Sequence, residues 1–303
     1  MPFGFAQSGI TVKRFCRNPI IVPNMDARMG DNINGPSLIR VPDWIPNPLG
    51  RYYLYFAHHT GSYIRLAYAD FLEGPWSIHT PGALDLEATP FSGHIASPDV
   101  HVDKERKEIR MYYHGVHEGS QKTAVAISRN GIDFASGTEV LGPFYFRVFT
   151  WKGFHYATAM PSRLYRSRDG LTPFARGPML LADVDEMSPG VPRTRHSALL
   201  VTGDTLNIFH SRKQDMPEHI LLSRVHLSGD WMTWKSSGDP ESVLFPECDY
   251  EGGRLPPARS ENGLVNGPVH QLRDPAIFQE GGRTYLLYSV AGENGIAIAE
   301  LLI

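Results

Sequence analysis

The sequence predicts an all-β fold, a five-bladed β-propeller in which four-stranded antiparallel blades surround a central funnel. Composition is the first reason: 29 glycines, 24 prolines and 11% aromatic residues in a chain of 303 are typical of many short strands joined by turns. The second reason is a repeat of polar entrance, apolar strand, glycine turn and second strand, with a period of roughly 45 residues. A unit this small cannot bury its own core, which favours radial packing of several units.

Five such units follow one another along the chain. The first three have their strands at 34–39, 51–58, 63–70 and 74–76, then at 97–102, 109–114, 123–128 and 130–134, then at 145–149, 154–158 and 164–167. The last two have theirs at 195–201, 205–211, 220–225 and 231–234, then at 273–278, 284–289 and 295–299. The fifth unit therefore stops one strand short.

The missing strand has a candidate near the start of the chain. Residues 10–15 read as a strand that precedes the first blade, so we expect this N-terminal strand to close the last blade and the whole of 1–303 to form a single domain. An insert at 236–267 separates the fourth and fifth blades. Long connections often carry function, so this one either borders the funnel or forms a surface belt between blades.

The topology predicts which residues face the funnel. In each blade the first strand starts, and the second strand ends, at the same face, so the polar residues at these points share one rim. Candidates for ligand binding at this rim are Asn34, His58, His94, His114, Arg147, Arg195, His210, His270 and Arg273. Other residues in the same slots are His59, Tyr145, Ser289 and Glu293.

Charge and hydropathy narrow the class of partner. The formal net charge is −3, which gives no footprint for nucleic acid or an anionic membrane and fits a carbohydrate or similar small molecule better. No run of 18 apolar residues occurs, and the first residues lack the basic start and apolar core of a secretory signal. We expect a cytoplasmic protein, unless a leader has been removed. The sequence indicates no oligomeric state.

Two aspartates next to prolines suggest chemistry at the rim. Asp99 and Asp274 lie near the starts of the first strands of the second and fifth units. Carboxylates that face one funnel can act as a paired acid and base, since crowding and burial separate their pKa values. The simpler interpretation is that an Asp beside Pro only forms a turn.

The segments at 97–100 with 110–113, and at 273–278 with 284–288, resemble the five-bladed propeller glycosidases. These comprise glycoside hydrolase families 43, 32, 62 and 117 and the mannoside phosphorylases. In family 43 an Asp of the first blade is the base, an Asp of the second blade tunes the pKa, and a Glu of the third blade is the acid. The resemblance implies the second role for Asp99.

The other two roles have no direct match. The first motif is Asn34-Gly35-Pro36, so Asp31 or Asp274 would be the base. No Glu occurs in 144–158, so Glu251 in the insert would be the acid, or a rim histidine such as His196 or His270, because family 117 uses His where an acid is expected.

The predicted function is therefore that of a glycoside hydrolase, inverting, acting on a small glycoside or oligosaccharide. Direct water attack requires a base and an acid roughly 6.5–9.5 Å apart. No cofactor is required. Some relatives hold a calcium at the axis, which makes a central calcium an option, although no spacing here specifies a metal site. The alternatives are a non-catalytic carbohydrate-binding propeller, and a phosphorylase if Arg147, Arg195 and Arg273 cluster to bind phosphate.

Overall fold

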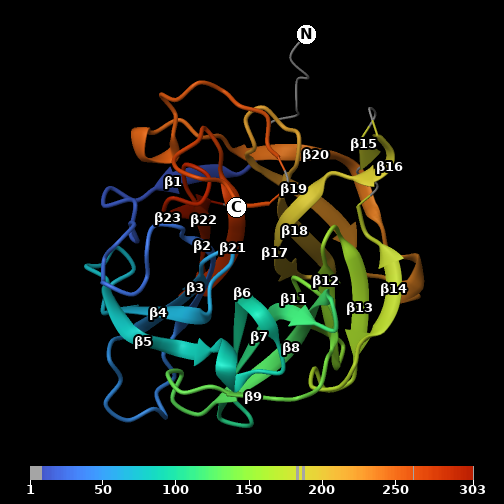
Figure 1. The fold of residues 1–303 in the computed structure, drawn as a ribbon. Coiled ribbons are helices and arrows are strands. Elements are labelled where there is room, and N and C mark those ends of the chain that lie inside the picture. The colour runs from blue at the N-terminus through green and yellow to red at the C-terminus, as the bar shows by residue number, and fades with distance from the viewer. Residues whose placement is uncertain (1–8, 182–183, 186–187, 262, 303) are drawn as a thin grey trace.

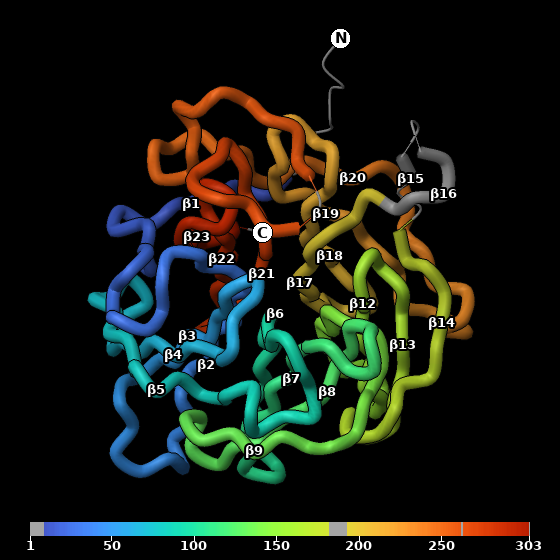
Figure 2. The backbone as a smooth tube through the Cα atoms, in the orientation of Figure 1, coloured from blue at the N-terminus to red at the C-terminus, as the bar shows by residue number. Residues whose placement is uncertain are grey.

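The computed structural model describes residues 9–181, 184–185, 188–261 and 263–302. Within these residues the strands form five antiparallel sheets around a common axis and one separate hairpin (Figures 1 and 2). The predicted five-bladed β-propeller is confirmed. Helical structure in the described part of the chain consists of short 3-10 turns, at η1 (Leu86–Ala88), η2 (Trp231–Thr233) and η3 (Asp249–Glu251). None of these is long and apolar enough to cross a bilayer.

The strands of the first three blades follow one another from the axis outward. Blade 1 contains β2 (Asn34–Arg40), β3 (Tyr52–Ala57), β4 (Tyr63–Ala69) and β5 (Ser77–Asp85). Blade 2 contains β6 (Ser92–Asp103), β7 (Glu108–His117) and β8 (Ser120–Ser128), edged by the two short strands β9 (Ala135–Ser136) and β10 (Gly142–Pro143). Blade 3 contains β11 (Arg147–Trp151), β12 (Phe154–Ala159), β13 (Arg163–Ser167) and β14 (Ala175–Met179).

The last two blades follow a hairpin of β15 (Val184–Asp185) and β16 (Ser188–Pro192). Blade 4 contains β17 (Thr194–Thr202), β18 (Thr205–Arg212), β19 (Ile220–His226) and β20 (Ser236–Leu244). Blade 5 contains β21 (Arg273–Glu280), β22 (Arg283–Ser289), β23 (Ile296–Leu302) and, as its outer strand, β1 (Thr11–Arg14). β1 runs antiparallel to β23 with Thr11 opposite Leu302, so this sheet combines strands that are almost 300 residues apart in the sequence.

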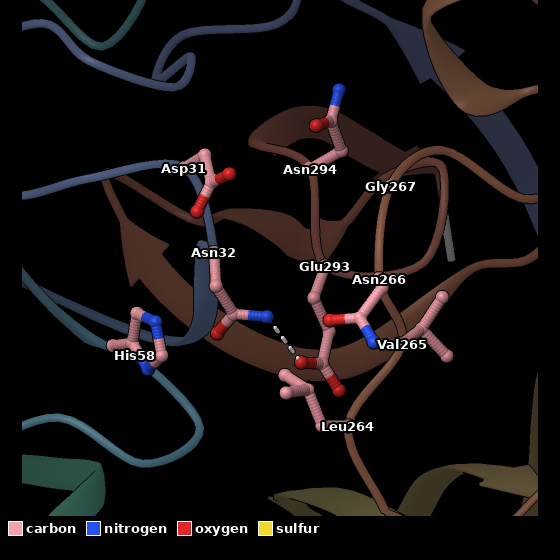
Figure 3. A pocket seen from close by; sticks show the side chains of 9 residues that line it. All are labelled: Asp31, Asn32, His58, Leu264, Val265, Asn266, Gly267, Glu293 and Asn294. Atoms are coloured by element: carbon pink, nitrogen blue, oxygen red, sulfur yellow. Dashed lines mark hydrogen bonds between the residues drawn. The ribbon is translucent and has the colours of Figure 1, made fainter.

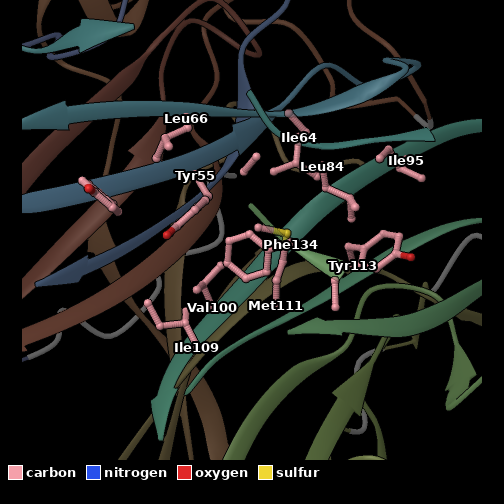
Figure 4. Close-up of a cluster of buried hydrophobic side chains, with 14 of the residues drawn as sticks. Tyr55, Ile64, Leu66, Leu84, Ile95, Val100, Ile109, Met111, Tyr113 and Phe134 are labelled. Atoms are coloured by element: carbon pink, nitrogen blue, oxygen red, sulfur yellow. The ribbon is translucent and has the colours of Figure 1, made fainter. Parts of the chain in front are cut away.

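The core lies between the blades. Successive residues of a strand point to opposite faces, and both faces of β3 are buried: Tyr52, Leu54 and Phe56 pack toward blade 5, whereas Tyr53 and Tyr55 pack toward blade 2. Figure 4 shows the cluster between blades 1 and 2. Each buried side chain of this size contributes about 1.5–3 kcal/mol. The second strand of blade 1 is therefore apolar along its whole length, because each of its two faces packs against a neighbouring blade.

The outer strands differ from the prediction. The segments 74–76, 130–134 and 231–234 were expected as strands, but they precede the outer strands β5, β9 and β20, and 231–233 forms η2. Because β20 occupies 236–244, the connection between blades 4 and 5 begins at 245 rather than at 236. These strands are half exposed and carry few apolar residues, which leaves them without a hydrophobic pattern.

Four of the inner strands have an irregularity where they begin. The register shifts between Asn34 and Ser37 in β2, and at the matching points of β6, β17 and β21. Gly35, Ser97 and Asp274 all take positive φ values, of 61°, 52° and 45°, directly before a proline. A bulge turns side chains out of the regular alternation, and here it directs them toward the end of the funnel.

Candidate active site

A cavity of about 440 Å³ lies at the end of the funnel where the inner strands start. Inner-strand starts supply Asn34, Ser97, Tyr145, His196 and Asp274, one from each blade. Ends of second strands, or the loops after them, supply His59, His114, Met160, Lys213 and Glu293. The remaining lining residues are Thr60, His94, Ala96, Gln121, Phe144, Arg195 and Gly263. All five blades therefore contribute to one enclosed site, as the topology predicts.

A smaller pocket of about 140 Å³ adjoins this cavity and shares Glu293 with it (Figure 3). Asp31, Asn32 and His58 form one wall, and residues 264–267 of the connection between blades 4 and 5 form the other. The connection thus borders the site rather than the outside of the propeller. Glu293 lies between the two spaces.

Asp274 is the buried carboxyl group of the cavity. Its side chain is 4% exposed, and Tyr145 donates a hydrogen bond to Oδ1 over 3.2 Å. Ser289 lies 3.4 Å from Oδ2. Burial raises the pKa of Asp274 to about 6, and the charge of Glu293 adds to this, against the opposing effect of the nearby arginines. Asp274 therefore exchanges its proton near neutral pH, as a catalytic acid or base must.

His196 completes the surroundings of Asp274. Its Nδ1 accepts the backbone N–H of Asp274 over 3.4 Å and lies 3.3 Å from Oδ1 of the same residue. The ring stacks on Tyr145 with 5.1 Å between centroids. Burial and the nearby Arg195 lower the pKa of His196 well below its ordinary value, so the imidazole is neutral.

Glu293 is tuned in the opposite direction. Asn32 donates to Oε2 over 2.6 Å and Asn34 donates to the same atom over 3.3 Å. Oε1 faces His59 at 3.2 Å and Arg273 at 3.0 Å. Burial alone would raise the pKa of Glu293, but His59, Asn32 and Arg273 lower it to about 2. Glu293 is therefore an anion across the whole neutral range.

His59 connects Glu293 to the cavity. Its side chain is 32% exposed and its Nδ1 is 3.2 Å from the Glu293 carboxylate, while the ring lines the cavity. A carboxylate on Nδ1 fixes the tautomer and orientation of an imidazole and leaves Nε2 for a substrate. His59 and Glu293 thus form an imidazole–carboxylate pair beside Asp274.

The structure brings together eight of the fourteen residues predicted for the site. Asn34, His94, His114, Arg195, His196 and Asp274 line the cavity. Asp31 and His58 line the smaller pocket. The other six do not line either space: Asp99, Arg147, His210, Glu251 and His270 bind other parts of the protein, and Arg273 lies behind Glu293 with 3.0 Å between Nη1 and Oε1.

Asp99 does not line the cavity, because Pro precedes Asp in its motif, whereas Asp precedes Pro at Asp274. Ser97 precedes Pro98 as Asp274 precedes Pro275, so Ser97 is the counterpart of Asp274 and Asp99 lies two residues further along the strand. Its Oδ2 accepts the amide of Val148 over 2.7 Å and contacts His101 at 2.8 Å. Burial opposes ionisation, but His101, Arg147 and this amide outweigh it and lower the pKa of Asp99. Its carboxylate links blade 2 to blade 3.

Glu251 is also removed from the site. It is fully buried, and its carboxylate binds Arg14 of β1 at 2.8 Å, Tyr288 at 2.8 Å and the amides of residues 247 and 248. A carboxylate with these partners serves structure. The acid role predicted for Glu251 is therefore not compatible with its environment.

Two predicted histidines likewise have structural partners. His210 is fully buried within blade 4, and its Nε2 lies 3.0 Å from Ser223. The ring nitrogens of His270 lie 2.9 Å from the carbonyl oxygens of Leu255 and Pro246. His210 therefore packs inside a sheet, and His270 holds the connection between blades 4 and 5 together.

Arg147 binds the backbone at the centre of the ring. It donates to the carbonyl oxygens of Ser97 at 3.0 Å, Phe146 at 3.2 Å and Ser197 at 3.2 Å, which come from three blades. Calcium requires several oxygen ligands, and these converging carbonyls already face a guanidinium. Among the described residues, no group of three or more His, Cys, Asp or Glu side chains could hold a metal ion. The three carbonyl oxygens therefore bind Arg147, and a central calcium remains an expectation.

Sequence reasoning did not assign roles to His59, Lys213 and Glu293. His59 and Glu293 were among the rim positions, but only contacts across blades 1 and 5 pair them. Lys213 follows β18 directly, so the rule that second strands end at the rim could have found it.

Proteins of known structure share the fold of this chain. No protein-family model matches the chain. Among solved structures, a thermostable family-43 glycoside hydrolase superposes with a TM-score of 0.63 at 14% identity, over 94% of this chain and 91% of that one. The α-L-arabinanase of Cellvibrio cellulosa in complex with arabinohexaose gives a TM-score of 0.56 at 15% identity, over 89% and 91%. These likenesses show the fold predicted from the resemblance.

A curated relative is much nearer in sequence. The uncharacterized protein R118 of Acanthamoeba polyphaga mimivirus is 37% identical over 320 residues, which cover 96% of this chain and 90% of R118. The chain therefore belongs to the protein family of R118, built on the five-bladed propeller that the family-43 glycoside hydrolases share.

Proposed function

We propose that this protein is a glycoside hydrolase that acts on a small glycoside inside the cavity, with Asp274 as its central catalytic group. One observation carries the proposal: a buried carboxyl group, Asp274, lines the same cavity as an imidazole that is paired with a carboxylate, His59 with Glu293. The raised pKa of Asp274 and the lowered pKa of Glu293 agree with a base and an orienting anion. The glycosidase fold of the structural neighbours supports the same class.

The proposed reaction is an inverting hydrolysis. Asp274 accepts a proton from water as the water oxygen bonds to the anomeric carbon, and a raised pKa makes its carboxylate a stronger base than an ordinary Asp. His59 acts as the acid in its imidazolium form: Nδ1–H faces the Glu293 carboxylate, and Nε2 gives its proton to the glycosidic oxygen as the carbon–oxygen bond breaks, which leaves a neutral imidazole. The products are a sugar with inverted configuration and an alcohol, and no cofactor takes part.

The test compares two aspartate variants on chromogenic α- and β-glycosides and natural oligosaccharides. We expect Asp274→Asn to lower kcat by a factor of about 10²–10⁴, the usual range for loss of an acid or base. Asp99→Asn is the matched control, because Asp99 binds only protein groups, and it should stay within about tenfold of the wild type. Full activity of Asp274→Asn would contradict the proposal.

A non-catalytic carbohydrate-binding propeller is the second candidate. The observation that favours it is the complete use of Glu293, whose two oxygens already face four side-chain nitrogens. Binding of oligosaccharides without turnover by the wild type would support this candidate. The phosphorylase alternative has less support, because Arg147 and Arg273 bind protein carbonyls and carboxylates, and only Arg195 of the three lines the cavity.

A further inference from the structure

Four basic residues gather where blade 4 meets the cavity, and three of them are paired. Arg193 and Arg212 both bind Asp215, the latter with 3.2 Å between Nε and Oδ2. Arg195 lies 3.4 Å from Glu218 and donates to the carbonyl oxygens of Glu261 and Gly263, both at 2.8 Å. The fourth is Lys213, which lines the cavity.

Lys213 differs from these neighbours in having no counter-charge. Within the described part of the chain, no carboxylate or other acceptor pairs with its ammonium group. Its backbone is held firmly, since its N–H donates to the carbonyl of Arg193 over 2.8 Å and its carbonyl accepts from Arg193 Nε over 3.2 Å. Burial and the nearby Arg195 lower the pKa of Lys213, as expected for a cation that lacks an anion.

The anions of the cavity do not satisfy this cation. Glu293 is surrounded by Asn32, Asn34, His59 and Arg273. Asp274 binds Tyr145, His196 and Ser289. The positive charge of Lys213 is therefore directed to whatever enters.

One residue that lines the cavity also has a ring nitrogen without a partner. His114 is 6% exposed and lines the cavity, yet its Nδ1 has no hydrogen-bond partner among the described residues. Burial lowers the pKa of His114 to about 3, so the ring is neutral and can donate or accept one hydrogen bond. A buried polar atom of this kind is costly unless a ligand or water pairs with it.

We propose that the cavity takes an acidic sugar, a glycoside or monosaccharide that carries a carboxylate or phosphate group, and that Lys213 binds that group. The inference rests on the proposed function and adds the class of its substrate. The volume of about 440 Å³ lies within the range of small-molecule sites. An ammonium beside an anionic oxygen in a partly buried place forms a charge-assisted hydrogen bond, stronger than the bond to a neutral hydroxyl.

Matched ligand pairs test the proposal by calorimetry at pH 7. Glucuronate is compared with glucose, galacturonate with galactose, and glucose 6-phosphate and glucose 1-phosphate with glucose. We expect at least one acid to bind the wild type about tenfold or more tightly than its neutral partner, the effect of one such bond. The carboxylate and phosphate arms identify which anion is recognised. Equal binding within every pair, or no binding of any acid, would overturn the proposal.

Three lysine variants assign the effect. Lys213→Gln should remove at least fivefold of the preference for the acid, and Lys213→Arg should retain it, because the charge remains. Lys235→Gln, an exposed lysine of the same blade, should bind like the wild type. An unchanged preference in Lys213→Gln, with its circular dichroism intact, would contradict the role of Lys213.

The outcome can be separated from that of the proposed function. Lys213-dependent binding of an acid, together with full turnover in Asp274→Asn, would leave the binding site standing and remove the catalytic assignment. Hydrolysis that depends on Asp274 but shows no preference for acidic glycosides would do the reverse.

Discussion

Asp274 has an unfavourable backbone conformation, and its carboxyl group is buried at a cost in free energy. Its φ of 45° lies in the left-handed region that Asp tolerates better than most residues, and its carboxyl group is almost fully buried. Strained residues of this kind gather at functional sites, held by the structure around them. Here the proline after Asp274, the bulge at the start of β21 and the stack of His196 on Tyr145 hold the carboxyl group in place.

The burial of Asp274 predicts a measurable dependence of stability on pH. Because the pKa is raised to about 6 from a model value of 3.8, the folded protein binds more protons than the unfolded chain between these values. The free energy of unfolding contributed by Asp274 therefore falls as pH rises from about 4 to above 6. Asp274→Asn cannot titrate and removes this loss. The free energy of unfolding of Asp274→Asn, relative to that of the wild type, should therefore rise by about 2 kcal/mol from pH 4 to pH 8. Urea unfolding at each pH measures the difference.

Asp99→Asn should give the opposite sign, but only below about pH 4, since the pKa of Asp99 is lowered from its ordinary value of 3.8. Its carboxylate contributes stability above the ordinary pKa of Asp, and this is lost as pH falls through the lowered value. A pH-independent difference between Asp274→Asn and the wild type would show that Asp274 titrates as an ordinary Asp.

The sequence alone indicated Asp274 as a candidate site residue, but it did not indicate which residues would surround it. The Asp-Pro start of an apolar strand is a local pattern, so it is readable. The roles of Glu293 and His59 depend on a contact between blades 1 and 5, and no local pattern encodes that pairing. Asp99 lies two positions further along β6 than expected, because the order of Asp and Pro is reversed in its motif. Glu251 pairs with Arg14, a contact between distant parts of the sequence that no local pattern indicates.

At the scale of elements, β1 is fixed by more than its ladder to β23. Arg14 binds the fully buried Glu251 with 2.8 Å between Nε and Oε1 and also donates to the carbonyl of Phe245 over 2.8 Å. The outer strand is thus joined to the connection between blades 4 and 5. Together these contacts fasten one end of the chain to the region just before β21.

Removing Arg14 should therefore weaken the whole fold. Arg14→Leu leaves the Glu251 carboxylate buried without a cation, and we expect a loss of about 3 kcal/mol in the free energy of unfolding. Urea unfolding measures this loss. Arg17→Leu is the control, because Arg17 is exposed and its loss should change stability by less than about 0.5 kcal/mol. Equal effects of the two substitutions would mean that the Arg14 pair contributes nothing to stability.

Inner and second strands were predictable from the sequence, and so was β1, whereas the outer strands β5, β9 and β20 were not. The second strand of a blade packs against two neighbours, so an unbroken apolar run marks it. An outer strand faces solvent on much of its surface, and β5 and β20 alternate irregularly between exposed and buried residues. Their positions follow from backbone pairing with the strand before them, which leaves little trace in side-chain chemistry.

At the scale of the whole molecule, a buried charge network lies beneath the cavity. Glu218 contacts Arg195 at 3.4 Å and Arg273 at 3.2 Å, and Arg273 contacts Glu293 at 3.0 Å. Ser260 of the connection also donates to Glu218. Blades 4 and 5, the connection and the floor of the cavity are held by one set of interactions.

Removing the negative charge of Glu218 from this network should lower the stability of the protein. Glu218→Gln leaves two buried guanidinium groups with one fewer carboxylate, and we expect a loss of about 3–5 kcal/mol in the free energy of unfolding. Limited proteolysis should also cut the connection near Ser260 sooner than in the wild type. Glu241→Gln, which removes a partly exposed pair with Arg224, should lose less than about 1 kcal/mol. A loss this small in Glu218→Gln would refute the structural importance of the network.

The pairing of β1 with β23 also sets an order of events during synthesis. β1 leaves the ribosome first, but the strand that it pairs with, and the residues Asp274 and Glu293 before it, emerge after the other four blades. Until then blade 1 has no neighbour on one side, and its Tyr52, Leu54 and Phe56 face water. Closure of the ring and completion of the cavity must therefore coincide, so a nascent chain that stops before β21 exposes the apolar face of blade 1 and lacks both Asp274 and Glu293.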